Sequence, residues 1–145
     1  MRYYLAGPFF NPLERENITK AIKILKDRNL DLFIPMDHKI EDGENLPNQV
    51  WGQKVFEMDR DAIYDCDAVI ALYYGLYSDS GTAFEIGFAH SLNKPIIVVH
   101  CNNTYESSLM IVNSATANLE NIDSLKNYDF NTLTSTNFIS HKPQK

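Results

Sequence analysis

Hydrophobic and polar residues alternate along the chain between short apolar runs and longer stretches with helical spacing. The apolar runs predict strands at Arg2–Ala6, Leu32–Pro35, Ala68–Tyr73, Pro95–His100 and, at an edge, Asn118–Ile122. The runs at 68–73 and 95–100 are apolar almost throughout, which is typical of strands buried on both faces. They therefore indicate the central strands of a sheet.

Segments with helical spacing lie between the predicted strands. Apolar residues recur every three or four positions in Leu13–Arg28, Val50–Tyr64, Thr82–Leu92 and a short segment near Ser107–Asn113. Asn11 followed by proline is a common start for the first of these helices. Asp37–Asn48 is a polar loop, and loops of about a dozen residues are uncommon in compact domains unless they have a function.

The order of these elements predicts the fold class. Strands alternate with helices, which indicates a single α/β domain over residues 1–145, with a doubly wound, five-stranded parallel sheet and helices on both faces. Ligands of such sheets bind beyond the carboxyl ends of the strands. We therefore expect functional residues in the segments that follow the strands, at 7–11, 36–39, 74–81 and 101–108.

Composition narrows the class of protein further. The 145 residues are 44% hydrophobic and 22% charged, as in ordinary folded domains. Thirteen basic and 19 acidic side chains give a net charge of -6, which argues against nucleic acid as a partner, because phosphate backbones need a basic face. Without a long apolar stretch or a signal-peptide pattern, the chain is expected to be cytoplasmic and not to contact membranes. The cysteines and histidines have no metal-site spacing, so no metal is expected.

The segment after the third strand holds the strongest chemical signal. Glu85 lies six residues after Asp79, and its neighbours from Ala83 to Ala89 carry no other charge. A single acid in such an apolar run is rarely there for solubility. Because a helix N-terminus carries partial positive charge, we expect Glu85 to stay ionised and to act as a nucleophile or general base. The alternative is that Asp79 only caps the helix and Glu85 is a solvated helix residue.

A second carboxylate lies on the second predicted helix. Asp59 follows Met58 and lies at the edge of a stripe formed by Trp51, Val55, Met58 and Ala62. The helical spacing of this stripe predicts that it faces the core. Asp59 is then placed between the buried and the solvated sides of the helix.

Residues of the first strand and of the polar loop complete the candidates. Tyr3 and Tyr4 alternate on the strand, so they point to opposite faces, and each hydroxyl needs a partner if it is buried. Gly7 marks a tight turn where a ligand could approach the backbone, but it is not part of a dinucleotide-binding GxGxxG motif. His38 is a candidate for binding because of its position in the loop.

Four motifs in a fixed order then allow a comparison with known families. They are YLAGPFFN from Tyr4, DHK at Asp37–Lys39, W-x(7)-D ending at Asp59, and D-x(5)-E-I-G from Asp79 to Gly87. Together with SLMI from Ser108 and LKNYDFN from Leu125, they resemble the nucleoside 2-deoxyribosyltransferase family over nearly the whole chain. The resemblance implies a flavodoxin-like sheet and the exchange of the base of a 2'-deoxynucleoside for another free purine or pyrimidine, without a cofactor or metal.

The resemblance also implies a role for each candidate residue. Glu85 corresponds to the nucleophile that forms a covalent deoxyribosyl ester at C1', and Tyr3 to the tyrosine that orients it. Asp59 and Asp79 correspond to the carboxylates that hold the base and handle its proton. The implied substrate-binding residues are Gly7, Phe9, His38, Lys39, Ser108 and Met110. This chemistry parallels that of retaining glycosidases and predicts ping-pong kinetics.

Departures from the family leave alternatives open. Ser108 replaces an asparagine that a neighbouring subunit donates to the sugar's 5' end, and related 2'-deoxynucleotide N-hydrolases have serine there. His38 and Lys39 stand where transferases often place a glutamine against the base, and a lysine favours a phosphate. Bulky Phe9 and Phe10 instead favour the transferase. The tail Asn137–Lys145 also differs, which leaves open whether the C-terminal carboxylate contributes to the site.

The reading favoured by these residues is a deoxyribosyltransferase that acts on 2'-deoxynucleosides and free bases. We expect a homo-oligomer, a dimer or a hexamer built from dimers, with active sites shared between subunits. One alternative is an N-glycosidase of 2'-deoxynucleoside 5'-monophosphates, and another is a non-catalytic, flavodoxin-like module that senses nucleotides.

Overall fold

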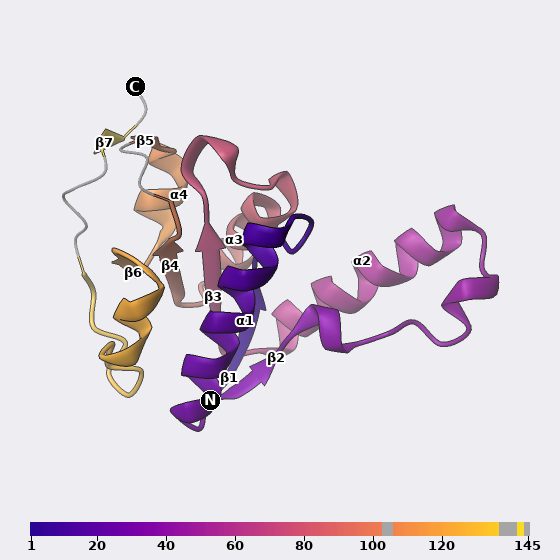
Figure 1. The fold of residues 1–145 in the computed structure, drawn as a ribbon, viewed down its shortest axis with the longest axis horizontal. Coiled ribbons are helices and arrows are strands. Elements are labelled where there is room, and N and C mark those ends of the chain that lie inside the picture. The colour runs from indigo at the N-terminus through magenta and orange to yellow at the C-terminus, as the bar shows by residue number, and fades with distance from the viewer. Residues whose placement is uncertain (103–105, 137–141, 144–145) are drawn as a thin grey trace.

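A five-stranded sheet forms the middle layer of the computed structural model, which describes residues 1–102, 106–136 and 142–143 (Figure 1). Its strands are β1 (Arg2–Ala6), β2 (Asp31–Phe33), β3 (Ala68–Tyr73), β4 (Ile96–His100) and β6 (Ala117–Leu119). They are ordered β2-β1-β3-β4-β6, and every neighbouring pair is parallel. This is the flavodoxin-like strand order, so the predicted fold is confirmed.

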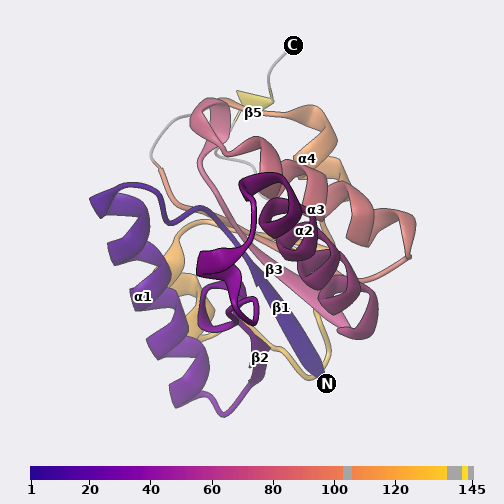
Figure 2. The ribbon, with the colours of Figure 1, turned by 90° about the vertical axis from the view of Figure 1, so that its right-hand side faces the viewer.

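Helices cover both faces of this sheet (Figure 2). On one face lie α1 (Pro12–Asp27) and the 3-10 turn Ile122–Lys126. On the other face lie α2 (Asn48–Asp65), α3 (Ser80–Ser91) and α4 (Leu109–Ser114). A separate pair of short strands, β5 (Glu106–Ser107) and β7 (Lys142–Pro143), is also parallel.

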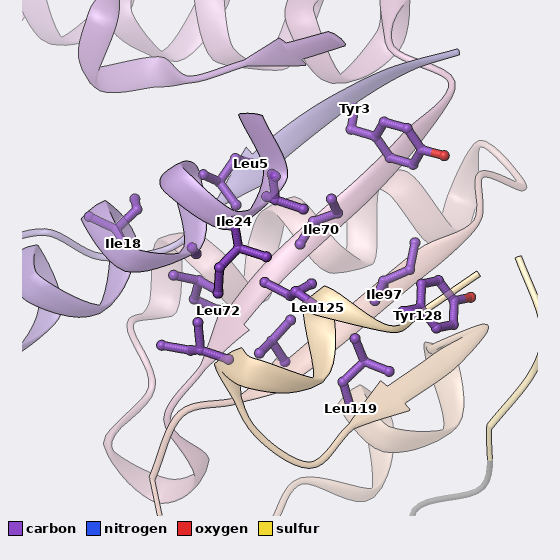
Figure 3. Packing of buried hydrophobic residues seen from close by; sticks show 14 of the residues in the cluster. Tyr3, Leu5, Ile18, Ile24, Ile70, Leu72, Ile97, Leu119, Leu125 and Tyr128 are labelled. Atoms are coloured by element: carbon purple, nitrogen blue, oxygen red, sulfur yellow. The ribbon is translucent and has the colours of Figure 1, made fainter. Parts of the chain in front are cut away.

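The alternation of side chains along each strand divides the core into two apolar clusters. Tyr3 and Leu5 of β1 belong to the cluster under α1, which Figure 3 shows together with Ile70 of β3 and Leu125 of the 3-10 turn. Tyr4 belongs to the cluster under α2 and α3. The middle strands β3 and β4 are buried along their whole length, as their continuous apolar sequences predict.

The predicted start of α1 is also confirmed. The side chain of Asn11 accepts a hydrogen bond from the backbone N–H of Glu14 at 2.9 Å. The Glu14 carboxylate in turn accepts the backbone N–H of Asn11 at 3.3 Å, and proline occupies the first helical position. This reciprocal pairing satisfies two N–H groups that a helix end otherwise leaves free, so it defines the end of the loop that follows β1.

Two expectations from the pattern need correction. Strand β2 ends at Phe33 because Pro35 begins a 3-10 turn, so the strand is shorter than predicted. The stripe on α2 does not face the core as a whole, since only Ala62 of its four members is buried and Trp51 is 46% exposed. The N-terminal half of α2 extends beyond the sheet (Figure 1), so its apolar side chains have no sheet to pack on.

Candidate active site

A cavity of about 810 Å³ opens at the carboxyl ends of β1 and β2. Its walls come from the turn after β1, the polar loop after β2, one face of α2 and the first turns of α3. Seven of the candidate residues line it: Gly7, Phe9, His38, Lys39, Asp59, Asp79 and Glu85. The fold thus brings together segments that are far apart in the sequence, at the edge where the sequence predicted a ligand.

Glu85 lies in the second turn of α3, with its carboxylate directed at β1. The Tyr4 hydroxyl donates a hydrogen bond to Oε2 of Glu85. Burial raises the pKa of Glu85 from an ordinary 4.5 to about 7; the Tyr4 hydrogen bond opposes this rise, and the charges of Asp59 and Asp79 add to it. Glu85 is therefore ionised less readily than the helix N-terminus alone led us to expect, because the field of a helix N-terminus fades within the first turn while burial acts on the whole group.

The tyrosine that contacts Glu85 is Tyr4, and the assignment of this role to Tyr3 is wrong. The Tyr3 hydroxyl donates to the backbone carbonyl of Phe130 at 3.2 Å, and its ring meets the Phe130 ring edge-on. Tyr3 lies in the cluster under α1 (Figure 3), on the other side of the sheet from α3. Neighbouring residues of a strand point to opposite faces, so a shift of one residue moves the hydroxyl across the sheet.

Asp79 is both a helix cap and part of the cavity wall. Its Oδ2 accepts the backbone N–H of Thr82 at 2.9 Å, which caps α3. Gly81 leaves room for this carboxylate, since a Cβ at that position would lie only 2.8 Å from Oδ2 of Asp79. The capping role and a role toward a ligand therefore coexist, because a carboxylate has several lone pairs and faces the cavity as well.

Asp59 reaches the same cavity from the opposite wall, on α2. Burial raises the pKa of Asp59, and the nearby charge of His38 opposes that rise. Oδ1 of Asp59 is buried and has no hydrogen-bond partner within the described part of the chain. A buried acceptor without a partner is unfavourable, so this oxygen is suited to a donor brought by a ligand.

Close approach explains the glycine at the end of β1. A Cβ on Gly7 would lie 3.0 Å from Cβ of Leu72 on the neighbouring strand β3. A larger residue would therefore push the turn away from the sheet. Gly7 and the following Phe9 both line the cavity, so the turn forms part of its wall.

Aromatic side chains that the sequence analysis did not single out also line the cavity. Phe56 of α2 and Phe84 of α3 pack against each other at a ring-centroid distance of 5.8 Å, although each is about half exposed. Arg60 lies over the Phe56 ring at 5.7 Å and pairs with Asp61 at 2.8 Å. In the sequence, Phe56 and Phe84 are apolar residues that lie outside the apolar stripe of their helices. Apolar residues in such positions are typical of an exposed ligand-binding or partner surface.

Ser108 and Met110 do not line the cavity that contains Glu85. They line a second cavity of about 570 Å³, formed with residues of α3 and of the turn after β3. The backbone N–H of Ser108 donates to the Tyr73 hydroxyl at 2.9 Å, and Met110 is 79% exposed. Within one chain these two residues therefore take no part in the site around Glu85.

The described residues contain neither a metal-binding cluster nor a helix that could span a membrane. Within residues 1–102, 106–136 and 142–143, no group of three or more histidine, cysteine, aspartate or glutamate side chains could hold a metal ion. In the same part of the chain, every helix is too short or too polar to cross a membrane. His141 lies outside the described residues.

The fold and the site together define a class of protein. It is a flavodoxin-like α/β protein in which a tyrosine-bound carboxylate lines one cavity at the strand ends together with Asp59, Asp79 and other acidic residues. Glycosyl transfer uses a pair of carboxyl groups. One bonds to the sugar carbon, and the other protonates the leaving group.

Comparisons with known proteins agree with this class. A family model for nucleoside 2-deoxyribosyltransferase matches residues 3–128. A nucleoside deoxyribosyltransferase of Limosilactobacillus fermentum is 30% identical over 145 residues, which cover 90% of this chain and 86% of that protein. One from Lactobacillus leichmannii is 23% identical over 139 residues, which cover 88% of each protein. The solved structure of the 2-deoxyribosyltransferase of Bacillus psychrosaccharolyticus matches with a TM-score of 0.86 and 30% identity, over 96% of this chain and 100% of that chain.

The chain belongs to the nucleoside 2-deoxyribosyltransferase family. The resemblance that its motifs indicated is thereby confirmed, and the protein is an enzyme of the transferase class.

Proposed function

We propose that this enzyme moves the 2-deoxyribosyl group of a 2'-deoxynucleoside from one base to another through a covalent ester on Glu85. The observation that carries the proposal is the hydrogen bond from Tyr4 to Glu85 inside the cavity that also contains Asp59 and Asp79. It directs one carboxylate into a space walled by aromatic and apolar side chains, with Asp59 and Asp79 among the further carboxylates that line it.

In the first half of the reaction, the bond between C1' and the base nitrogen breaks. Its electron pair stays on the base, which takes up a proton from a carboxyl group, and an oxygen of Glu85 bonds to C1'. Asp79 and Asp59 are the candidates to hold the base and supply the proton, since both line the cavity together with Glu85. Protonation of the leaving group and an anion opposite the sugar carbon are the two requirements of this step.

In the second half, a nitrogen of a free base attacks C1', the bond between C1' and the Glu85 oxygen breaks, and the N–H proton of the base passes to the carboxylate that gave up a proton in the first half. Each half inverts the configuration at C1', so the product keeps the configuration of the substrate. The first base leaves before the second base enters, which gives ping-pong kinetics. Aromatic walls such as Phe9, Phe56 and Phe84 favour a flat base over water in the acceptor position, because stacking buries apolar surface.

The charges around the cavity favour an uncharged nucleoside over a 5'-monophosphate. Five acidic residues line it, against the two cations Lys39 and Arg60. The acidic residues are Asp42, Glu44, Asp59, Asp79 and Glu85. Arg60 already pairs with Asp61, so Lys39 is the main counter-charge for a phosphate. A phosphate that loses its water needs several donors or cations, and this margin offers few.

A base-exchange assay tests the proposed function. Deoxyinosine and free adenine are incubated with the enzyme, and the products are separated by chromatography. Formation of deoxyadenosine supports the transferase. Release of hypoxanthine without deoxyadenosine, from deoxyinosine or from its 5'-monophosphate in a parallel reaction, would indicate a hydrolase. No turnover of either compound would indicate a binding module.

We also propose that the active site is completed across a subunit interface of a homo-oligomer. The support is the position of Ser108 and exposed Met110, on a surface apart from the Glu85 cavity of the same chain. If sites are shared, Glu85→Ala and Met110→Asp proteins should each be inactive, while their mixture regains activity. One site of the mixed pair then has an intact Glu85 and an intact partner segment. A mixture as inactive as its components, or a fully active monomer by light scattering, contradicts the proposal.

A further inference from the structure

The tyrosine that holds Glu85 is one half of a stacked pair of rings. Tyr4 of β1 and Phe33 of β2 lie opposite each other in the parallel register of the two strands. Their ring centroids are 5.6 Å apart, and their planes differ by only 10°. Both side chains are buried in the cluster under α2 and α3. The ring that carries the donor hydroxyl is therefore supported along its face by its neighbour in the sheet.

Phe33 is held in place by further groups, and it lies outside the cavity. The His38 ring stacks on Phe33 at 4.1 Å and 5°, and the Arg2 guanidinium lies over the Phe33 ring at 5.7 Å. Tyr4 and His38 line the Glu85 cavity, whereas Phe33 does not. Any effect of Phe33 on the reaction must therefore pass through a neighbouring residue.

The plane of the Tyr4 ring decides the direction in which its hydroxyl can donate. Rotation about χ2 of a tyrosine has only a broad preference. The hydroxyl hydrogen of a phenol stays close to the ring plane, because the oxygen lone pair conjugates with the ring. A turn of the ring about its long axis therefore swings the O–H bond relative to a fixed acceptor. A parallel ring packed on its face resists this turn, because the stacked contact would be lost.

We propose that Phe33 is a positioning residue for the nucleophile, because its ring holds the plane of Tyr4 so that the hydroxyl donates to Glu85. This inference rests on the proposed role of Glu85 and adds a residue that lies outside the cavity. The hydrogen bond from Tyr4 favours the charged form of Glu85 and fixes the direction of its carboxylate. A loosened Tyr4 ring should therefore leave the nucleophile less often ionised and aligned.

Removal of the flat ring tests the proposal. Phe33→Met keeps an apolar side chain but offers no ring face to Tyr4. In single turnover with enzyme in excess, we expect it to slow the maximal release of hypoxanthine from deoxyinosine by about three- to fivefold, which is part of the loss expected for Tyr4→Phe. The enzyme concentration that gives half of the maximal rate should not change, because Phe33 does not line the cavity. Phe33→Tyr keeps the ring and should retain the parental rate.

Two readouts separate positioning from a general effect on packing. In the Tyr4→Phe background, Phe33→Met should slow release by less than about 1.5-fold, because the hydroxyl that it positions is already absent. In the parent background, Phe33→Met should move the acid limb of kcat/KM to higher pH, since the Tyr4 hydrogen bond lowers the pKa of Glu85. Asp59 on α2 and Asp79 at the start of α3 also act on Glu85, and both are kept in every variant.

The other face of β1 offers a matched control. Phe130 is also buried, and its ring meets the Tyr3 ring edge-on at 5.4 Å. Phe130→Met should lower the stability in urea, as Phe33→Met does, but leave the release rate and the acid limb unchanged. Circular dichroism checks the fold of every variant, and Phe33→Leu takes the place of Phe33→Met if that variant does not fold.

Four results would overturn the inference. Equal losses from Phe33→Met with and without the Tyr4 hydroxyl, or a comparable loss from Phe130→Met, would show an effect on packing alone. A change confined to the half-saturating enzyme concentration would show that Phe33 acts on binding through His38. No change in the rate or in the acid limb would show that Phe33 has no role.

The proposed function is tested separately by the parent enzyme. If the parent exchanges bases, any of these four results removes the role of Phe33 and leaves the proposed function intact. A parent enzyme that exchanges no base overturns the proposed function together with this inference.

Discussion

Helix α3 separates two cavities that differ in chemistry. Gly81, Phe84 and Glu85 line the larger one, which also receives Asp59 and Asp79. The other face of the helix lines the smaller one with Ala83, Ile86, Gly87 and His90. No carboxylate lines that smaller cavity among the described residues, and its polar groups are hydroxyls, backbone and one imidazole. One helix therefore has an acidic side and a side whose cavity contains no carboxylate among the described residues.

A comparison of two carboxylates, Glu85 and Asp123, shows that burial, more than the number of nearby acids, makes a carboxylate reactive. The pKa of Glu85 rises to about 7 because partial burial disfavours its charge and two other acids lie near it, and these effects outweigh the hydrogen bond from Tyr4. By contrast, Asp123 is fully exposed, and hydrogen bonds from Lys126 and Lys20 lower its pKa. A group that is poised between its two states at neutral pH can gain and lose a negative charge during a reaction cycle.

The largest expected effect comes from removing the reactive carboxylate. Glu85→Ala should reduce base exchange by about a thousandfold or more, because the loss of a nucleophile disables the groups that act with it. Exchange between deoxyinosine and adenine measures the loss, and circular dichroism checks the fold. Glu57→Ala, an acid on α2 outside both cavities, is the control and should keep parental activity. Activity of Glu85→Ala within tenfold of the parent would contradict the assignment.

The next effect concerns the proton for the leaving base. Asp79→Asn should lower the rate of release of natural bases by about a hundredfold, because an amide cannot deliver a proton. The rate with 7-methyl-2'-deoxyguanosine should fall much less, because its base already carries a positive charge and leaves without a proton. Asparagine caps helices as well as aspartate does, so α3 should stay intact. Single-turnover release of each base measures the two rates. Equal losses for both substrates would rule out the acid role of Asp79.

The two adjacent tyrosines of β1 give a sharp internal comparison. Tyr4→Phe removes the hydroxyl that donates to Glu85 and should lower kcat by about tenfold, in line with the loss of a charge-assisted hydrogen bond. Tyr3→Phe removes the bonds from the hydroxyl to the Phe130 carbonyl and to the Met1 sulfur, and it should leave kcat unchanged, with about 1 kcal/mol less stability. Steady-state kinetics and urea unfolding measure both. A larger kinetic effect of Tyr3→Phe would restore the original assignment.

The raised pKa of Glu85 predicts how activity and stability depend on pH. The carboxylate is needed as a nucleophile, so kcat/KM of the free enzyme should fall about tenfold per pH unit below pH 7. Glu85 keeps its proton up to about pH 7 in the folded state but only to about 4.5 when unfolded. Between about pH 4.5 and pH 7 the unfolded chain therefore binds fewer protons than the folded chain. The contribution of Glu85 then lowers the free energy of unfolding as the pH rises through this range.

Glu85→Gln isolates this effect on stability. The variant cannot ionise at this position, so it should be more stable than the parent at pH 8 and show little difference at pH 4.5. Urea unfolding at the two pH values measures the change. A stability difference that does not depend on pH would contradict the raised pKa.

The smallest effect concerns the second cavity, where Ser108 lies. The parent should prefer 2'-deoxyadenosine over its 5'-monophosphate by at least about tenfold in kcat/KM, or about 1.4 kcal/mol of transition-state binding. Ser108→Asn should increase this preference by a few fold, because in the proposed shared site a longer side chain from the partner subunit fills the space beside O5'. A clear preference of the parent for the monophosphate would favour the hydrolase instead.

Much of the site could be predicted from local spacing. Asp79 and Glu85 are six residues apart around one helix start, and a lone acid in an apolar run is visible in the sequence. Asp59 and Gly7 were found in the same way, through their places on a helix edge and at a strand end, whereas Phe9 came from the family resemblance, and all three line the cavity. The segments after the strands converge because parallel strands end at one edge of the sheet.

The roles of Tyr4 and of the α2 stripe could not be predicted in this way. The alternation of β1 shows that Tyr3 and Tyr4 point to opposite faces, but not which face lies under α3. The spacing of Trp51, Val55 and Met58 shows one side of a helix, but not that this side lines a cavity rather than the core. The role of Tyr4 and the role of the α2 stripe both depend on which segment of the chain packs against β1 and against α2.

The sequence by itself determined the elements, the parallel sheet and the acidic pair at the start of α3, because these depend on neighbours a few residues away. Only the tertiary structure decided that Tyr4 meets Glu85, 81 residues further along the chain, and that burial raises the pKa of Glu85 to about 7. It also placed Ser108 and Met110 in a different cavity from Glu85. Contacts between distant segments and the exclusion of water arise only when the layers pack, so no local pattern records them.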